Sequence, residues 1–311
     1  MAVAHVQTGA GAARRRRLRR GWSTPYLFIL PFAVLFVVFF IVPIIYAVDQ
    51  SFYRSQRSGL GLGGPPTVAF NGLNNFHDVF TDSAFWGGLG RVVLYGVVQV
   101  PVMLGLALIF ALLLDSTVVR LKAFFRLAFF VPFAVPGVIA AILWGYLYNP
   151  DVSPIIKGMH ALGANVDLLG PNTILWSIAN VVTWEWTGYN MLIIYSALQA
   201  IPGEIYEAAR IDGCTGLGIA RYIKIPLVAP ALVLTGVLSI IGTLQLFNEP
   251  QVFKGFSNNI SSTFTPNIYA YNTAFGNNDY YYAAALAVVL ALFTFVLSFG
   301  FLRLTRQQSG V

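Results

Sequence analysis

Side chains that could carry out acid–base, nucleophilic or metal chemistry are few in this sequence and far apart. The chain has three histidines, His5, His77 and His160, and one cysteine, Cys214. Zinc sites and catalytic centres need several such groups brought together, and an intrachain disulfide needs two cysteines. We therefore expect no catalytic residue, no metal site and no cofactor bound by this chain.

One acidic residue lies deep in an apolar stretch. Glu185 stands near the middle of 172–199, between Trp184 and Trp186. A carboxylate at that depth in a membrane is costly unless it faces a wet cavity or a partner. Three interpretations stay open. Glu185 and the tryptophans contact a polar ligand such as a sugar, a protonated or hydrogen-bonded Glu185 ties this stretch to another helix, or Glu185 is displaced to the membrane interface.

Three amides are further polar candidates. Asn190 follows Glu185, whereas Gln245 and Asn248 gather with Glu249 at the end of a later apolar stretch, where they could equally cap a helix. The predicted substrate pathway consists of Glu185, Trp184, Asn190, Gln245 and Asn248.

A compact charged segment separates two apolar stretches. It should begin with a helix that carries Glu204 and Glu207 in its first turn, where the helix dipole favours anions. Gly213 should end this helix, because glycine adopts a positive φ at low cost. A second short helix is expected from about Leu217 to Lys224. The segment therefore predicts helix, turn and helix at a membrane face.

The face of the first helix suits close approach by another protein. Ala208 and Ala209 have little bulk, and Glu207 and Asp212 beside them keep this face out of lipid. A solvated connector with ordinary caps is the alternative interpretation.

Composition indicates the environment of the whole chain. Of its 311 residues, 57% are hydrophobic and 10% are charged, and the mean hydropathy is +0.70. Soluble domains carry about 25% charged residues, so we expect contact with membrane lipid. The pI near 9.6 derives largely from Arg14–Arg17, Arg19 and Arg20, which precede an apolar stretch and favour a lipid surface over nucleic acid.

Six apolar stretches are long enough to cross a bilayer. They cover approximately residues 25–48, 87–114, 124–148, 172–199, 226–247 and 283–302. With this parity, fourteen Lys and Arg residues lie on the face that holds both termini and five lie on the other. The positive-inside rule therefore places the termini and the charged segment in the cytoplasm.

The expected fold is an all-α polytopic membrane protein with three parts. Residues 1–24 form a basic cytoplasmic leader expected to be disordered, 25–303 form the six-helix domain with its loop at 202–225, and 304–311 form a cytoplasmic tail. The third stretch should kink, because Pro132 and Pro136 each remove a backbone donor next to Gly137.

The segment from Glu207 to Pro226 resembles a known motif. Glu207-Ala208-Ala209, then Gly213, then Ile223 and Ile225-Pro226 resemble the EAA loop of ATP-binding cassette importer permeases, with Ile225 where the family usually has leucine. Asn75-Phe76 and Phe85-Trp86 resemble positions before the second span of carbohydrate permeases. Nearly the whole chain is similar to the maltose, multiple-sugar and glycerol-3-phosphate permeases, and most to the maltose-type first subunit.

This resemblance implies partners and a mechanism. It implies a second permease subunit as a heterodimer, an ATPase dimer that binds ATP and Mg²⁺, an extracytoplasmic sugar-binding protein, and alternating access in a prokaryotic inner membrane. It implies coupling roles for Glu207, Ala208, Ala209, Asp212, Gly213, Ile223 and Pro226. No Gly-x-x-x-x-Gly-Lys-Ser/Thr loop occurs in the chain, so ATP should bind elsewhere.

Other transport mechanisms have less support in the sequence. A proton-coupled secondary transporter would have to use Glu185, the one deep titratable residue. A channel would need repeated polar rings along a pore, and the sequence contains none.

Overall fold

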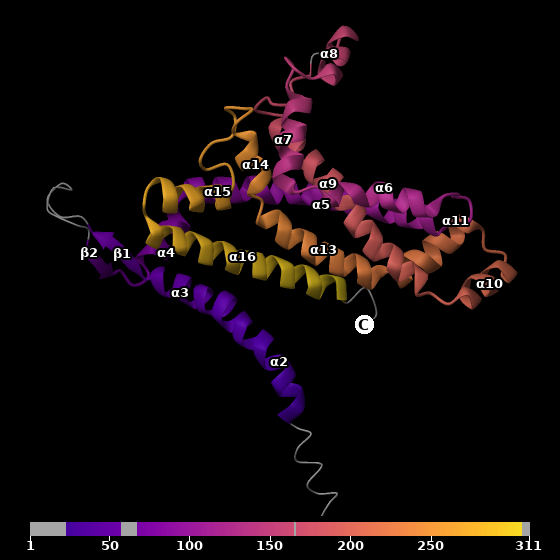
Figure 1. Ribbon diagram of the computed structural model, residues 1–311, viewed down its shortest axis with the longest axis horizontal. Helices are drawn as coiled ribbons and strands as arrows, with labels where there is room; N and C mark the ends of the chain where they lie inside the picture. The colour runs from indigo at the N-terminus through magenta and orange to yellow at the C-terminus, as the bar shows by residue number, and fades with distance from the viewer. Residues whose placement is uncertain (1–22, 57–66, 165, 307–311) are drawn as a thin grey trace, which may run out of the picture.

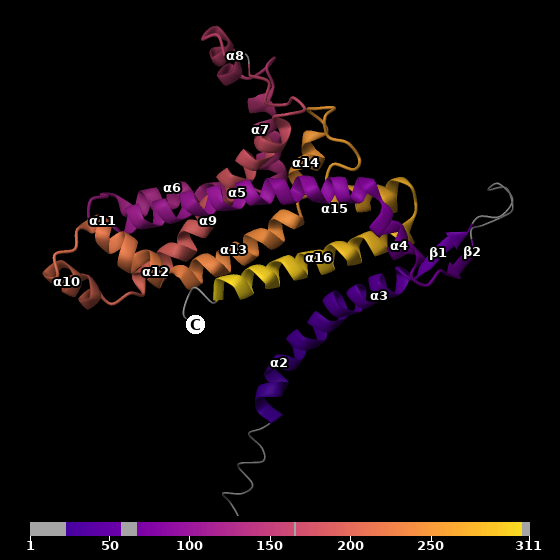
Figure 2. The same cartoon turned by 180° about the vertical axis from the view of Figure 1, so that it is seen from behind.

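A computed structural model describes residues 23–56, 67–164 and 166–306. The expectations for the basic leader up to residue 22 and for the tail from residue 307 lie outside these residues. Long helices form most of the described chain. Five of them lie alongside one another as a bundle (Figures 1 and 2): α5 (Ser83–Asp115), α6 (Lys122–Ala134), α9 (Ile174–Gln199), α13 (Ala229–Leu244) and α16 (Tyr280–Arg306).

One helix is central to this bundle. α9 packs against α5, α6 and α13, and it buries twelve of its residues. Two hydrophobic cores include residues of α9. One of them contains Tyr95 and Phe253, and the other contains Ala107 and Met191. Because α9 is largely surrounded by protein, it can carry polar residues without exposing them to lipid.

The shorter elements occupy the ends and one side of the bundle. Figure 1 shows α10 and α11 at one end and α4 with the strands at the other, while α7 and α8 project sideways with α14 near α7. These elements are α4 (Asn74–Thr81), α7 (Gly137–Tyr148), α8 (Pro154–Ala161), α10 (Gly203–Ile211), α11 (Gly216–Ile219), the π-helical turn η3 (Ala220–Lys224), α12 (Ile225–Leu227), α14 (Asn248–Phe253), α15 (Pro266–Tyr271) and the π-helical turn η4 (Asn272–Gly276).

The first helical stretch leads away from the bundle. It consists of α2 (Ser23–Phe36), a π-helical turn η1 (Val37–Ile41) and α3 (Val42–Gln50). Antiparallel strands β1 (Tyr53–Gln56) and β2 (Thr67–Phe70) follow, with Tyr53 opposite Phe70. α3 lies against α16, but no side chain from Tyr26 to Gln50 is buried, so most of this helix is not covered by the chain.

Several of the described helices could cross a membrane by length and apolar composition. Four segments do so alone: Tyr26–Gln50, Ser83–Asp115, Ala229–Phe253 and Tyr280–Thr305. The pair α6 and α7 makes a fifth if it is counted as one span. α9, with 26 residues, is long enough but more polar, as its central position allows.

The third predicted span is two helices and not one kinked helix. α6 ends at Ala134, Val135 is extended with φ −79° and ψ 125°, and α7 begins after Pro136. The two helices differ in direction by 95°. Proline restricts the preceding residue to extended conformations, so Pro136 breaks the helix where a bend was predicted.

The fifth predicted span also contains a break between two helices. α13 ends at Leu244, Gln245 follows its last turn, and Asn248 opens the separate helix α14. Gln245 and Asn248 therefore lie on either side of the short connection between α13 and α14, and they do not share the end of one helix.

Close backbone approach lets α6 and α9 pack together. An ideal Cβ on Gly188 of α9 would stand 1.8 Å from the carbonyl oxygen of Phe129 in α6. Any side chain at residue 188 would therefore push the two helices apart, since a backbone oxygen cannot rotate away.

Partly buried polar contacts join the elements at the end of the bundle opposite α10. Asp82 caps α5 by accepting from the backbone N–H of Ala84 at 2.8 Å, and its Oδ2 accepts from the hydroxyls of Tyr269 and Tyr282 at 2.6 and 2.8 Å. Burial raises the pKa of Asp82, but these hydrogen bonds outweigh it and hold the pKa below its usual value. Asp82 therefore joins α5, α15 and α16 as a carboxylate.

Asn75 and Phe85, two of the residues that resemble positions before the second span of carbohydrate permeases, have structural roles here. The Asn75 side chain donates to the carbonyl oxygens of Ser51 and Tyr53 at 2.8 and 2.7 Å. Phe85 is fully buried. Phe85 is therefore a core residue, and only Trp86, which is 38% exposed, is free to meet a lipid interface.

Candidate functional site

The loop between α9 and α12 is a helix, a tight turn and a second helical segment. Its turn is a Schellman motif: the N–H of Gly213 donates to the carbonyl of Arg210 at 3.0 Å, and the N–H of Cys214 to that of Ala209 at 2.9 Å. Gly213 has φ +83°, which glycine adopts without strain. Thr215 then caps α11 by accepting from Gly218. Both helices are thus closed by local hydrogen bonds.

Two details of this loop differ from expectation. Ala209 is only 7% exposed, so it is not part of a free face. Ala209 lies three residues after Tyr206, so both are on the face of α10 that packs against the rest of the protein. Glu207 lies beyond the first turn of α10, which contains Glu204, so Glu207 is a solvated side chain and does not stabilise the helix N-terminus.

The outer surface of the loop is apolar in part. Ile211, Leu217 and Tyr222 are 86%, 82% and 77% exposed. Glu207, Ala208, Asp212, Gly213 and Pro226 are also exposed, and Ile223 is half-buried. Exposed apolar side chains on a loop that also carries charged ones are consistent with a protein contact surface.

A pocket of about 330 Å³ lies among α5, α9, α13 and the start of α14. Its apolar walls carry a few polar groups, which is the usual composition of a site for a small solute. The polar side chains that line it are Gln99, Asn190, Ser239, Thr243, Gln245, Asn248 and Glu249, together with Tyr95, Trp186 and Tyr189. Of the predicted pathway residues, the structure therefore brings Asn190, Gln245 and Asn248 together.

Trp184 is separated from this pocket. Its ring meets Trp144 edge-on at 5.8 Å and packs against the core that contains Phe253. Trp186, two residues later, lines the pocket and meets Tyr189 edge-on at 5.7 Å. The prediction that Trp184 lines the pathway is therefore not supported by its position, and Trp186 with Tyr189 supplies the aromatic wall.

Glu185 faces a second carboxylate. An ideal Cβ on Gly137 would stand 3.3 Å from Oε1 of Glu185 and 3.5 Å from Oε1 of Glu249. Glu185 is 6% exposed, and its Oε2 has no hydrogen-bond partner within the described residues. The hydroxyl of the fully buried Tyr95 likewise has none there. Glu185 thus lies behind the pocket, and Glu249 lines it.

Fixed polar contacts hold the pocket walls. Nε2 of Gln99 is 3.3 Å from Oγ1 of Thr183, and Nδ2 of Asn190 donates to the carbonyl of Trp186 at 3.0 Å. These bonds orient the amides of α5 and α9 before any solute arrives. Within the part of the chain that the structure describes, no three His, Cys, Asp or Glu side chains are grouped to hold a metal ion.

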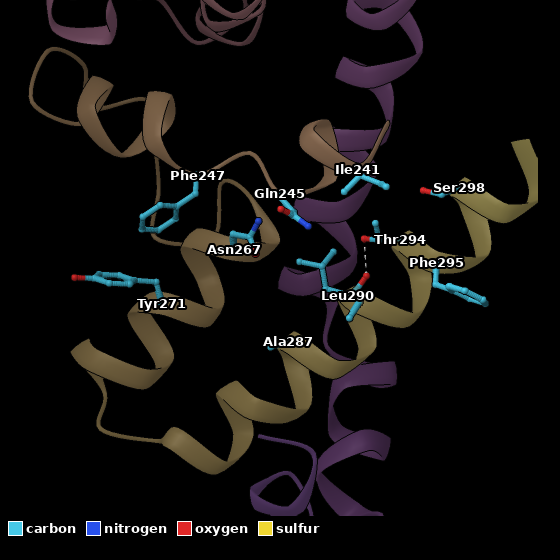
Figure 3. A pocket seen from close by; sticks show the side chains of 11 residues that line it. Ile241, Gln245, Phe247, Asn267, Tyr271, Ala287, Leu290, Thr294, Phe295 and Ser298 are labelled. Atoms are coloured by element: carbon cyan, nitrogen blue, oxygen red, sulfur yellow. Dashed lines mark hydrogen bonds between the residues drawn. The ribbon is translucent and has the colours of Figure 1, made fainter. Parts of the chain in front are cut away.

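An open groove of about 670 Å³ continues from the pocket along α13, α15 and α16. Figure 3 shows Gln245 and Asn267 near one another, with Thr294 and Ser298 along α16. Gln245 and Phe247 line both the pocket and the groove. The groove therefore extends the polar surface of the pocket onto the side of the bundle.

Several residues of this site were not predicted from the sequence. Gln99 is the one strongly polar side chain in the middle of α5, and that isolation was a usable signal. Glu249 was noted only as part of a helix cap, because nothing in its sequence neighbourhood indicates that it faces Glu185.

The chain resembles known transport proteins over most of its length. Residues 103–307 match the family described as "Binding-protein-dependent transport system inner membrane component". The lactose transport system permease protein LacF of Rhizobium radiobacter is 35% identical, over 90% of this chain and 91% of that protein. The sn-glycerol-3-phosphate permease UgpA of Agrobacterium fabrum is 32% identical, over 88% and 92%.

Solved structures share the fold. A bacterial ABC transporter involved in the import of the acidic polysaccharide alginate contains a chain that superposes with a TM-score of 0.78 at 17% identity, covering 95% of this chain and 99% of that one. A second structure of the alginate transporter, in complex with a periplasmic protein bound to an alginate pentasaccharide, gives the same TM-score. With the family match across α5 to α16, the chain belongs to the inner membrane components of binding-protein-dependent transport systems.

Proposed function

We propose that this chain is the permease subunit of an ATP-driven importer, and that its solute is a sugar delivered by an extracytoplasmic binding protein. The observation that carries the proposal is the loop from α10 to α12, which is closed by local hydrogen bonds and presents Ile211, Leu217 and Tyr222 to solvent at one end of the bundle. Two relatives are named as permeases of lactose and arabinooligosaccharide transport systems, which supports a sugar as the transported solute.

The proposed topology has six crossings with both termini in the cytoplasm of a prokaryotic cell, across the inner membrane. α2 with α3, α5, the α6–α7 pair, α9, α13 and α16 would be the crossings, and residues 25–303 would form the domain between the leader and the tail. The excess of Lys and Arg on the α10 face supports this orientation.

The surfaces of the chain support three kinds of protein partner. A second permease, expected to be a different chain, would cover the unburied helix Tyr26–Gln50 and the groove beside α16. An ATPase pair, which would bind ATP and Mg²⁺, would dock on the α10–α12 loop. The binding protein would dock at the opposite end of the bundle, where α4 and the hairpin lie.

The pocket is the proposed solute contact of this chain. Carboxylate and amide oxygens accept hydrogen bonds from sugar hydroxyls, and the rings of Trp186 and Tyr189 can stack on the C–H face of a sugar. Alternating access would open this pocket to each side in turn. Membership of this family does not favour the alternative of a proton-coupled carrier that uses Glu185.

Leu217→Asp should weaken docking of the ATPase. Burial of a leucine side chain contributes about 1.5–3 kcal/mol, so we expect at least a tenfold lower affinity, since about 1.4 kcal/mol corresponds to a factor of ten. The measurement is the amount of ATPase that co-purifies with tagged permease at graded dilution.

Leu162→Asp is the matched control. Leu162 is 89% exposed and follows directly after α8. α8 lies away from α10 (Figure 1), so this variant should retain the ATPase. Equal retention by the two variants at every dilution would contradict docking through the loop.

Glu249→Gln should lower sugar uptake without changing assembly. A hydrogen bond to a charged acceptor contributes about 1.5–3 kcal/mol, so uptake below saturation should fall about tenfold or more. Uptake is measured with the sugar that the wild-type complex imports fastest from a labelled panel containing lactose and arabinose oligomers. The control is Asp151→Asn, which changes an exposed residue of a loop and should import normally. Normal uptake by Glu249→Gln as well would show that Glu249 is not part of the pathway.

A further inference from the structure

One carboxylate connects the loop to two of the helices that line the pocket. Asp115 is the last residue of α5, and it forms an ion pair with Lys224 of η3. The two side chains are only 10% and 15% exposed. The other carboxylate oxygen of Asp115 accepts from Nε2 of Gln199, the last residue of α9, at 2.6 Å. The ends of α5 and α9 and the loop thus meet at one side chain.

Two further contacts enclose this ion pair. The ammonium of Lys224 lies 5.1 Å from the ring centre of Tyr206 in α10, an arrangement in which the ring attracts the cation. Lys122, at the start of α6, donates to the backbone carbonyl of Asp115 at 3.4 Å. Burial and then the charge of Asp115 raise the pKa of Tyr206, so the ring that faces Lys224 stays neutral.

The position of Asp115 is unfavourable without these partners. An acidic residue at a helix C-terminus opposes the helix dipole, and a largely buried charge needs a partner of opposite sign. Gln199 donates one hydrogen bond to Asp115, but Lys224 supplies the opposite charge that balances it. The contact therefore discourages separation of the loop from α5.

The same helices reach the pocket. α5 supplies Tyr95 and Gln99, and α9 supplies Trp186 and Asn190. The two helices also share a core near the loop, formed by Ala111, Ile194 and residues around them. A displacement of the loop that is transmitted to Asp115 would therefore move both of these walls.

We propose that Asp115 is a positioning residue that, with Lys224, locks the α10–α12 loop to the ends of α5 and α9, so that the loop and two pocket walls move as one rigid body. The inference rests on the proposed function, in which an ATPase displaces this loop. It assigns to the pair the transmission of that displacement to the pocket.

Distances within the chain test the lock directly. Spin labels are placed on the native Cys214, which is exposed, and on a cysteine introduced at Val118, which is 86% exposed, in the complex purified with its ATPase. The wild-type complex should give one narrow distance distribution that is the same without nucleotide and with ATP and vanadate. Asp115→Asn should broaden it and make it depend on nucleotide.

Uptake for each ATP hydrolysed separates transmission from mere stability. Asp115→Asn and Lys224→Gln should each keep hydrolysis within twofold while uptake of the imported sugar falls about tenfold. The exchanged pair Asp115→Lys with Lys224→Asp should restore both the narrow distance and the uptake. If the lock only stabilised the fold, hydrolysis and uptake would fall together with the amount of complex, and the inference would be wrong.

A narrow, unchanged distance in Asp115→Asn would also overturn the inference. Failure of the proposed function would look different, because no ATPase would co-purify with the wild-type chain. The label distance without nucleotide would still report in that case whether Asp115 holds the loop.

Discussion

Permease carrying Gly188→Val is expected not to accumulate as a folded protein. A Cβ at residue 188 would stand 1.8 Å from the carbonyl oxygen and 2.6 Å from the carbonyl carbon of Phe129, and 3.0 Å from Cα of Phe130. All three are backbone atoms, so the clash can be relieved only if α6 and α9 separate. Overpacking usually lowers the free energy of unfolding by about 1–3 kcal/mol. A clash with three backbone atoms should cost more and fall among the exceptional cases above about 4 kcal/mol.

The measurement is the amount and the melting temperature of detergent-solubilised protein. Gly105→Val in the neighbouring helix α5 is the matched control, because an ideal Cβ there meets no atom within 4 Å. This control should accumulate at close to the wild-type level. Wild-type amounts and melting of Gly188→Val would show that α6 and α9 do not approach as closely as described.

Gly213→Val is expected to uncouple uptake from ATP hydrolysis while the protein still inserts and folds. Gly213 has φ +83°, and no atom lies within 4 Å of an ideal Cβ on it, so the cost is conformational and not steric against neighbours. A β-branched residue with positive φ is strained by about 1–3 kcal/mol, which opens the turn between α10 and α11. Uptake should fall between about tenfold and a hundredfold.

Two other variants test whether the loss of uptake comes from the positive φ of Gly213. Gly213→Asn should fall between the wild type and Gly213→Val, because asparagine tolerates left-handed backbone conformations better than other side chains. Gly203→Val changes a glycine of the same loop that has no positive φ and no atom near its ideal Cβ, so it should import normally. Full uptake by Gly213→Val at wild-type expression would contradict a coupling role for the turn.

The proline pair shows how far a local signal reaches. Pro132 and Pro136 predicted a bend, and the residue before Pro136 is indeed extended. The direction of α7 after the break depends on what it packs against, and the 95° turn places it beside α14. A sequence can therefore indicate the place of a break but not its angle.

The two tryptophans illustrate the same limit. Trp184 and Trp186 have nearly the same sequence environment, yet one packs in the core and the other lines the pocket. In a helix that is covered on several sides, hydrophobic periodicity does not say which neighbour each face meets. The partner of Glu185 is hidden for the same reason, since Glu249 belongs to a short helix far along the chain.

Local chemistry was sufficient for most of the apolar helices and for the Gly213 turn, because these depend on residues within a few positions of one another. The pocket, the burial of Ala209 and the contact between Asp115 and Lys224 became visible only in the folded chain. Each of them joins segments that are remote in sequence, and burial inside a bundle, where one helix covers another, determines which of their side chains meet.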